Sequence, residues 1–164
     1  MFTLSKGFTL VELMVTIAIA ALLLSIGVPS FTAMYEATRS ANEIQKINDL
    51  FAFARNQAVN YGATVTVCPY AVPPCGNDWS KGFSVYIEKN GSKKVLKVID
   101  GFNSKDTISL TGPTDKTVNF TSDGLVSTET SIIYCPSGES DGSKSIKIST
   151  SGLIKEGSDN QSCL

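Results

Sequence analysis

The chain has 164 residues, with 14 lysines and arginines against 15 aspartates and glutamates and a formal net charge of −1. This length fits one domain plus an additional element, and the balanced charge predicts no overall attraction to nucleic acid or anionic lipid. The sequence contains no histidine, P-loop or GxGxxG motif, so we expect a protein that is not an enzyme and holds no cofactor or metal.

The first predicted element is an apolar helix from Phe8 to Val28, in which Glu12 is the only charged residue. About 21 residues form roughly 32 Å of helix, which is enough to cross the hydrocarbon core of a bilayer. A cleaved secretory signal has a shorter apolar region followed by a small-x-small site. We therefore expect a retained membrane anchor, in which Glu12 either lies near the interface or has a charged partner on another subunit.

The stretch KGFTLVEL around Glu12 resembles the class III signal of type IV pilins, a short basic leader followed by an apolar helix. The resemblance implies that a prepilin peptidase cleaves the chain after Gly7 and that the new N-terminal residue, Phe8, becomes N-methylated. It also implies that Glu12 pairs with the N-terminal amine of a neighbouring subunit during assembly. Pseudopilins of type II secretion share this signal, so it does not separate the two systems.

Pro29 follows the apolar run and removes one helical hydrogen bond, so we expect a kink in a helix that continues. Over residues 29–61, apolar side chains recur at spacings of three and four, which predicts one buried face. These side chains are Ile44, Ile47, Phe51, Ala54 and Ala58. The charged residues among them are expected to face solvent or another subunit; they are Glu43, Lys46, Asp49 and Arg55. Gly62 is predicted to end the helix.

Residues 62–164 predict an antiparallel, β-rich globular head made of short strands. The expected strands are ATVTVCP, WSKGFSVYIEK, KKVLKVID, TISLTG, KTVNFTSDGLV, SIIYCPSG and KSIKISTSGLIKEG. The second and third of these strands are expected to form a hairpin around an Asn90-Gly91 turn. Further turn signals are Asp123-Gly124, Ser137-Gly138, Asp141-Gly142 and Ser151-Gly152.

Four cysteines lie outside the apolar run: Cys68, Cys75, Cys135 and Cys163. An even count behind an export-like N-terminus favours two disulfides formed in an oxidising compartment. Four cysteines allow three pairings, and the short proline-rich loop between the first two favours Cys68–Cys75 with Cys135–Cys163. The rival is a zinc site of four thiolates, although CPYAVPPC fits the short CxxC spacing of such sites poorly.

The order of leader, long helix and short strands resembles the GspH/FimT family of minor pilins and pseudopilins, on its FimU-like side. Two segments carry this resemblance, ARNQAVNYG (Ala54 to Gly62) at the helix end and FTSDGLV (Phe120 to Val126) in the head. The resemblance implies an α+β type IV pilin fold, in which a long N-terminal helix packs on an antiparallel β-rich C-terminal head.

The resemblance also implies four regions: a cleaved leader (1–7), a transmembrane and pilus-core half of the helix (8–28), an amphipathic half (29–61) and the head (62–164). The chain would be a single-pass protein of the bacterial inner membrane with its head in the periplasm, and would then enter the pilus fibre, at its tip. The implied partners are other minor and major pilins, the prepilin peptidase and the inner-membrane assembly platform.

Some FimT-like proteins bind DNA for natural transformation through a G-R-x-R motif near the final strand. The matching stretch here is Ser151 to Lys155, in which Leu153 replaces the first arginine and Lys155 the second. Lysine presents a single point charge and leucine carries no charge, so we expect weaker phosphate binding here than with the two arginines of that motif. Lys144, Lys147 and Lys155 are the remaining DNA-binding candidates. We favour a minor pilin of the priming or tip complex; a DNA receptor and a GspH-like pseudopilin of type II secretion are the alternatives.

Overall fold

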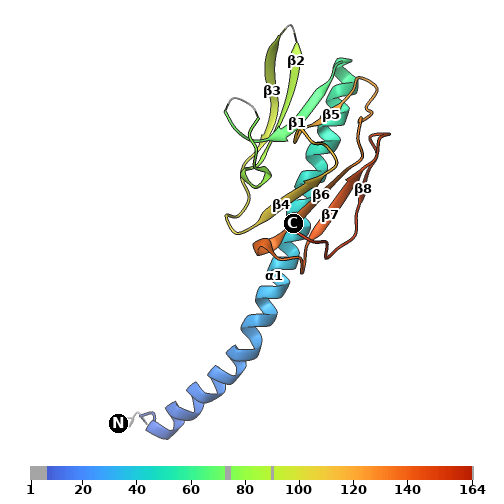
Figure 1. Cartoon of the computed structure of the whole chain (residues 1–164). Helices are drawn as coiled ribbons and strands as arrows, with labels where there is room; N and C mark the ends of the chain where they lie inside the picture. The colour runs from blue at the N-terminus through green and yellow to red at the C-terminus, as the bar shows by residue number, and fades with distance from the viewer. Residues whose placement is uncertain (1–6, 73–74, 90, 164) are drawn as a thin grey trace. The chain divides into compact units, whose positions relative to one another are not determined.

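The computed structural model describes residues 7–72, 75–89 and 91–163, and these form one long helix and two four-stranded sheets (Figure 1). The chain divides into an N-terminal unit, Met1–Ala37, and a head unit, Thr38–Leu164. Helix α1 (Leu10–Tyr61) contributes residues to both units.

In the N-terminal unit, α1 begins directly after Thr9, whose hydroxyl accepts a hydrogen bond from the Glu12 N–H at 3.2 Å. A threonine in this position satisfies one of the free N–H groups of the first helical turn. The helix continues through Pro29, and the Thr32 hydroxyl donates to the carbonyls of Val28 (3.2 Å) and Pro29 (2.9 Å). The helix therefore continues past Pro29 as expected, while the kink stays a prediction.

In the head unit, the predicted apolar face of α1 packs into the core, which confirms the helical periodicity. The buried helix residues are Ser40, Ile47, Leu50, Phe51, Ala54 and Ala58. The Phe51 ring meets the Phe83 ring edge-on with 6.0 Å between centroids, a favourable arrangement for two aromatic rings. After the helix, Gly62 has φ of 58°, a left-handed conformation that glycine adopts without the Cβ penalty of other residues.

The first sheet contains the strands β1 (Val65–Pro69), β2 (Phe83–Lys89), β3 (Ser92–Ile99) and β5 (Val118–Phe120). Their order is β3-β2-β1-β5, and neighbouring strands are antiparallel. The predicted β2–β3 hairpin is present. Asn90, the first residue of its predicted Asn90-Gly91 turn, lies outside the described residues.

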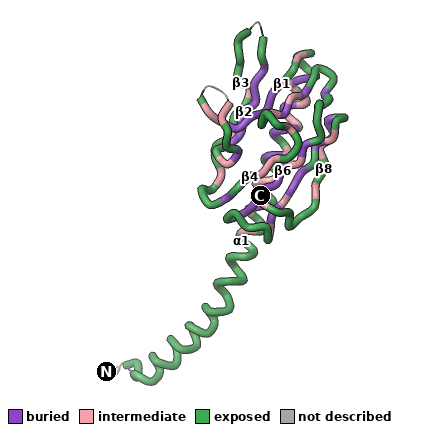
Figure 2. The backbone as a smooth tube through the Cα atoms, in the orientation of Figure 1, coloured by how far each residue is buried: buried purple, intermediate pink, exposed green. Residues whose placement is uncertain are grey.

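The second sheet contains β4 (Thr107–Thr111), β6 (Thr130–Cys135), β7 (Lys144–Ile148) and β8 (Ile154–Glu156). Their order is β4-β6-β7-β8, again with antiparallel neighbours. Figure 2 shows that buried residues occur along strands of both sheets. The largest fully buried side chains are Tyr134, Phe51, Phe83 and Phe120, so the core joins α1 to both sheets.

The predicted start of β2 is wrong, and two other predicted segments are interrupted at the turns expected at Asp123-Gly124 and Ser151-Gly152. Trp79–Lys81 forms the short 3-10 helix η1 instead of opening β2, because the Asp78 carboxylate accepts the Ser80 N–H and caps the turn. The segment KTVNFTSDGLV is a strand only at Val118–Phe120, and a turn follows. The segment KSIKISTSGLIKEG is two strands, β7 and β8, joined by a turn that contains Gly152 with φ of 72°.

The cysteines form two disulfides in the pairing favoured from the sequence. Cys68 is bonded to Cys75 with 5.5 Å between Cα atoms, and Cys135 to Cys163 with 6.1 Å. A four-thiolate zinc site is incompatible with this pairing, and the described residues contain no other group of three potential metal ligands. The disulfides also agree with the oxidising compartment expected from the export-like N-terminus.

The Cys135–Cys163 disulfide holds a C-terminal segment that lies beside the start of β7. The Gly157 N–H donates to the Ser145 carbonyl at 2.8 Å, and the Asn160 N–H donates to the Ser143 carbonyl at 3.1 Å. The Ser145 hydroxyl donates to the Ser158 carbonyl at 2.7 Å. The segment is thus part of the folded head, and the disulfide closes a loop of sequence separation 28.

Replacing both Cys135 and Cys163 with serine should lower the free energy of unfolding by about 3 kcal/mol, because the unfolded chain regains the entropy of an open loop. Replacing Cys68 and Cys75 with serine should cost about 2 kcal/mol, because that disulfide spans a sequence separation of only 7. Denaturant unfolding of both variants measures the difference. An equal loss, or the reverse order, would contradict the loop-entropy explanation.

Candidate assembly and binding surfaces

The N-terminal unit presents an apolar helical surface. Its exposed large apolar residues are Phe8, Leu10, Val11, Leu13, Met14, Val15, Ile17, Ile19, Leu22, Leu23, Leu24, Ile26, Val28, Phe31, Met34 and Tyr35. By length and composition, α1 is able to cross a membrane. An uncovered apolar surface of this size marks contact with a membrane or with other proteins.

Glu12 lies in the first turn of α1, where a carboxylate interacts favourably with the positive end of the helix dipole. Thr9 and Glu12 have the spacing of a capping box, in which an N-cap threonine is followed three residues later by glutamate or glutamine. Gly7 and Phe8 are exposed and precede the helix, while Met1–Lys6 lie outside the described residues. Cleavage after Gly7, methylation of Phe8 and pairing of Glu12 stay predictions.

The three candidate DNA-binding lysines do not form one cluster. Lys147 and Lys155 are direct register partners in β7 and β8, so their side chains share one face of the sheet. Lys144 is three residues before Lys147 in the same strand, and successive side chains alternate between faces, so it lies on the opposite face. There it forms an ion pair with Asp159. Of the three candidates, Lys147 and Lys155 therefore share a face, and Lys144 does not add its charge to that pair.

Arg55 contacts two turns of the head instead of facing solvent or another subunit, and this part of the sequence prediction was wrong. Its Nε donates to the Gly124 carbonyl at 3.2 Å and its Nη2 donates to the Ser151 carbonyl at 3.2 Å. The turns also touch each other, since the Val126 N–H donates to the Thr150 carbonyl at 3.0 Å. Arg55 thus connects the ARNQAVNYG segment with the FTSDGLV segment. The sequence carries no signal for these two contacts, because Gly124 is 69 residues and Ser151 is 96 residues from Arg55.

A buried polar network joins α1 to the second sheet. Arg39 Nη2 lies 2.9 Å from Asp106 Oδ1, which also accepts the Ser137 N–H at 2.9 Å, and the Tyr134 hydroxyl donates to Asp106 Oδ2. The Asp106 side chain is only 1% exposed. Burial and the hydrogen bond with Asp106 raise the pKa of Tyr134 above its ordinary value. Sequence analysis missed this network, because its members lie on separate elements.

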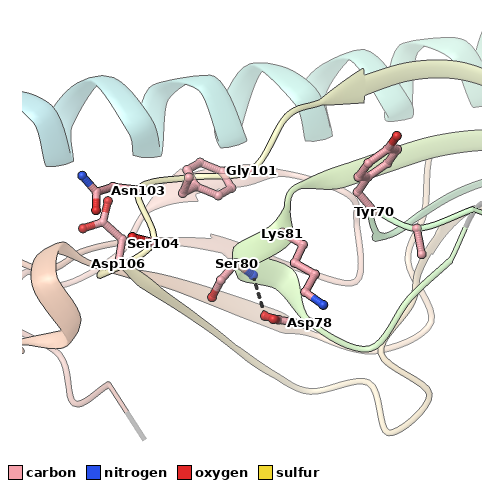
Figure 3. Close-up of a pocket in the computed structure, with 10 residues that line it drawn as sticks. Tyr70, Asp78, Ser80, Lys81, Gly101, Asn103, Ser104 and Asp106 are labelled. Atoms are coloured by element: carbon pink, nitrogen blue, oxygen red, sulfur yellow. Dashed lines mark hydrogen bonds between the residues drawn. The ribbon is translucent and has the colours of Figure 1, made fainter.

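A pocket of about 650 Å³ lies between η1 and the segment that precedes β4. Its lining residues are drawn in Figure 3. Its charged lining residues are Asp78, Lys81 and Asp106. The Asp78 carboxylate accepts the Ser80 N–H at 3.0 Å, and both oxygens of Asp106 are occupied by the network described above. These acids therefore stabilise the local fold, and the pocket is not assigned a ligand.

Comparison with protein-family models identifies the family to which this chain belongs. The model of the type II transport protein GspH family matches residues 43–152, and that of the prokaryotic N-terminal methylation motif matches residues 3–28. The chain belongs to the GspH family. The matched part of this GspH-family chain includes Arg55, both turns that it holds, and Asp106 with Tyr134 and Ser137, while Arg39 precedes it. The methylation motif covers the predicted cleavage site and Glu12.

The solved structures agree with this assignment. Two crystal structures of the type IV minor pilin FimU from Pseudomonas aeruginosa PAO1 are 26% identical to this GspH-family chain, with TM-scores of 0.62 and 0.59. They cover 82% and 73% of this chain and 99% and 96% of the FimU chains. The minor pseudopilin EpsH of the Vibrio cholerae Type 2 Secretion System is 10% identical, with a TM-score of 0.54, coverage of 73% of this chain and 96% of its own, and shows the fold alone. Comparison with curated protein sequences gives no match.

These comparisons confirm the predicted type IV pilin fold. Pilins and pseudopilins are structural, non-enzymatic proteins, and the apolar helix and methylation motif fit membrane anchoring and incorporation into a fibre. Membership of the family also implies association with other pilins and with a prepilin peptidase.

Proposed function

We propose that this GspH-family chain is a minor pilin of a type IV pilus that joins the priming or tip complex and supports pilus assembly. The observation that carries this proposal is the similarity of this chain to the minor pilin FimU, at 26% identity over 82% of the chain. The similarity to a type II secretion pseudopilin has only 10% identity and bears on the fold alone. A DNA receptor has less support, because Lys144 is paired with Asp159 and lies on the other face from Lys147 and Lys155.

In this proposal the apolar half of α1 first anchors the chain in the inner membrane with the head in the periplasm. The prepilin peptidase cleaves after Gly7, and Phe8 becomes the methylated N-terminus. The helix then leaves the bilayer for the fibre core, where a lone Glu12 carboxylate would be costly. The Phe8 amine of an adjacent subunit would neutralise that carboxylate. A subunit at the correct position along the fibre axis is then favoured over a displaced subunit.

Replacing Glu12 with alanine should lower the amount of this chain in sheared pili at least about tenfold, because an amine in the fibre core loses its partner. Glutamine is the informative second variant. It is accepted at this position of a capping box, so Glu12→Gln keeps the helix cap and loses only the charge. We expect both variants to fail equally, with the chain in sheared pili measured by immunoblot.

The same strains distinguish the proposed function from its alternatives. A deletion strain complemented with the wild-type gene should regain surface pili, and the two Glu12 variants should not restore them. Normal incorporation of Glu12→Gln would show that Glu12 only caps the helix. A deletion strain with normal pili but impaired exoprotein secretion would instead support a pseudopilin, and one with normal pili but impaired DNA uptake would support a DNA receptor.

A further inference from the structure

Strand β3 is a long, exposed edge of the first sheet. It pairs with β2 on one side, and no other strand of the described residues pairs with it (Figure 1). Figure 2 shows that most of its length is exposed, and only Leu96 and Ile99 of its eight residues are half-buried. Alternate backbone N–H and C=O groups on the free side of an edge strand are available to pair with another chain.

The β2–β3 hairpin carries a positive charge that the rest of the head lacks. Residues 83–99 contain four lysines, Lys89, Lys93, Lys94 and Lys97, against one acid, Glu88. Residues 100–164 contain five lysines against nine acids. The hairpin is therefore a basic edge on a head that is otherwise acidic, and it suits a partner of negative charge.

The lysines of β3 lie on both faces of the strand, and two of them are held against aromatic rings. Lys93 Nζ is 4.9 Å from the centre of the Tyr86 ring, and Lys97 Nζ is 5.1 Å from the centre of the Phe53 ring. Such contacts hold a long side chain in place while its charge remains available to solvent. The edge thus offers partly ordered charges, which lose less entropy when a partner binds.

Two exposed valines accompany the charge. Val95 is 46% exposed and Val98 is 38% exposed. The register places Val95 beside Tyr86 and Val98 beside Ser84, which puts both valines on the same face as Lys93. Lysines that only prevent edge pairing do not require neighbouring exposed valines. An apolar pair beside Lys93 on one face, with Lys94 and Lys97 on the other, is instead a surface that selects side chains of an added strand.

We propose that β3 is the docking strand for an extended, acidic segment of another pilin in the same fibre, an inference that rests on the proposed function. The partner would add a strand to the free edge of β3. Its carboxylates would lie beside Lys94 and Lys97, and its apolar side chains beside Val95 and Val98. Nucleic acid fits this edge less well, because Tyr86 is only 8% exposed and is covered by Lys93, so it offers no stacking surface.

The first test reverses the charge of the edge in the full-length chain. Lys94→Glu with Lys97→Glu should reduce the chain in sheared pili roughly tenfold, because several attractive charge pairs become repulsive. Lys105→Glu with Lys116→Glu is the matched control, since it makes the same change in net charge at exposed residues outside the hairpin. Because Lys97 also covers Phe53, the single Lys94→Glu variant repeats the test without that contact, and thermal unfolding in detergent checks the fold.

The second test identifies the partner with a photoreactive amino acid at Val95 in piliated cells. We expect a cross-link to another pilin, mapped by mass spectrometry to an acidic segment and lost in the Lys94→Glu, Lys97→Glu background. A cross-link that survives this background, or normal incorporation of the charge-reversed chain, would overturn the proposal. Normal incorporation of the charge-reversed chain together with a loss of DNA uptake would also overturn the proposal. So would a Lys94→Gln, Lys97→Gln chain that is incorporated normally but self-associates more than the wild-type chain. Absence of the wild-type chain from sheared pili would instead refute the proposed function itself.

Discussion

Replacing Asp106 with alanine is expected to lower the free energy of unfolding of the head by about 3–5 kcal/mol, the cost of breaking a buried ion pair by removing one partner. The Asp106 carboxylate accepts bonds from the Arg39 guanidinium, the Tyr134 hydroxyl and the Ser137 N–H. Its removal leaves a guanidinium that is 18% exposed without its carboxylate, and Arg39 Nε has no hydrogen-bond partner among the described residues. Denaturant unfolding, followed by the intrinsic fluorescence of Trp79, measures the loss.

Tyr134→Phe is the matched control, because it removes one hydroxyl and keeps the ion pair. It should cost about 1–2 kcal/mol near neutral pH. The folded pKa of Tyr134 is raised above the unfolded value near 10, so its contribution is complete below pH 10 and is lost as the pH rises further. The wild-type head should lose stability between about pH 10 and pH 11, and Tyr134→Phe should lose less. Equal losses for Asp106→Ala and Tyr134→Phe would contradict a structural role for the ion pair.

Replacing Gly152 with alanine is expected to destabilise the head by about 3–5 kcal/mol, from the left-handed backbone together with a steric conflict. Gly152 has φ of 72°, and a Cβ atom there would lie 1.8 Å from the Gly124 carbonyl oxygen and 2.9 Å from Arg55 Nε. That carbonyl is the acceptor for Arg55, so the added methyl group would separate the two turns that Arg55 holds. Thermal unfolding of the purified chain measures the effect.

Gly142→Ala separates the two causes. Gly142 has nearly the same φ, 73°, but the nearest atom to its added Cβ is Pro136 Cγ at 3.6 Å, an ordinary van der Waals contact. This variant should cost about 1–2 kcal/mol, the backbone penalty alone. If Gly142→Ala and Gly152→Ala lost the same stability, the close packing of the two turns would contribute nothing.

The sequence by itself determined the features that depend on neighbouring residues. A continuous apolar run with one carboxylate indicates a helix long and apolar enough to cross a membrane, and spacings of three and four residues indicate the buried face of α1 at Ile47, Phe51 and Ala54. The count and spacing of the cysteines likewise favoured the two disulfides that the structure contains. Each of these signals is local, because it depends on helix geometry or on a short loop.

Only the tertiary structure decided which distant residues meet. Arg39 and Asp106 are 67 residues apart, and Arg55 and Ser151 are 96 apart, so composition and periodicity contain no information about either contact. Strand register also determines which of the candidate lysines share a face of the second sheet. A side chain changes face with every residue, so Lys144 lies apart from Lys147 and Lys155 although all three are close in sequence. The order of the strands then places the basic β3 at a free edge, because a position within a sheet depends on pairing between distant segments.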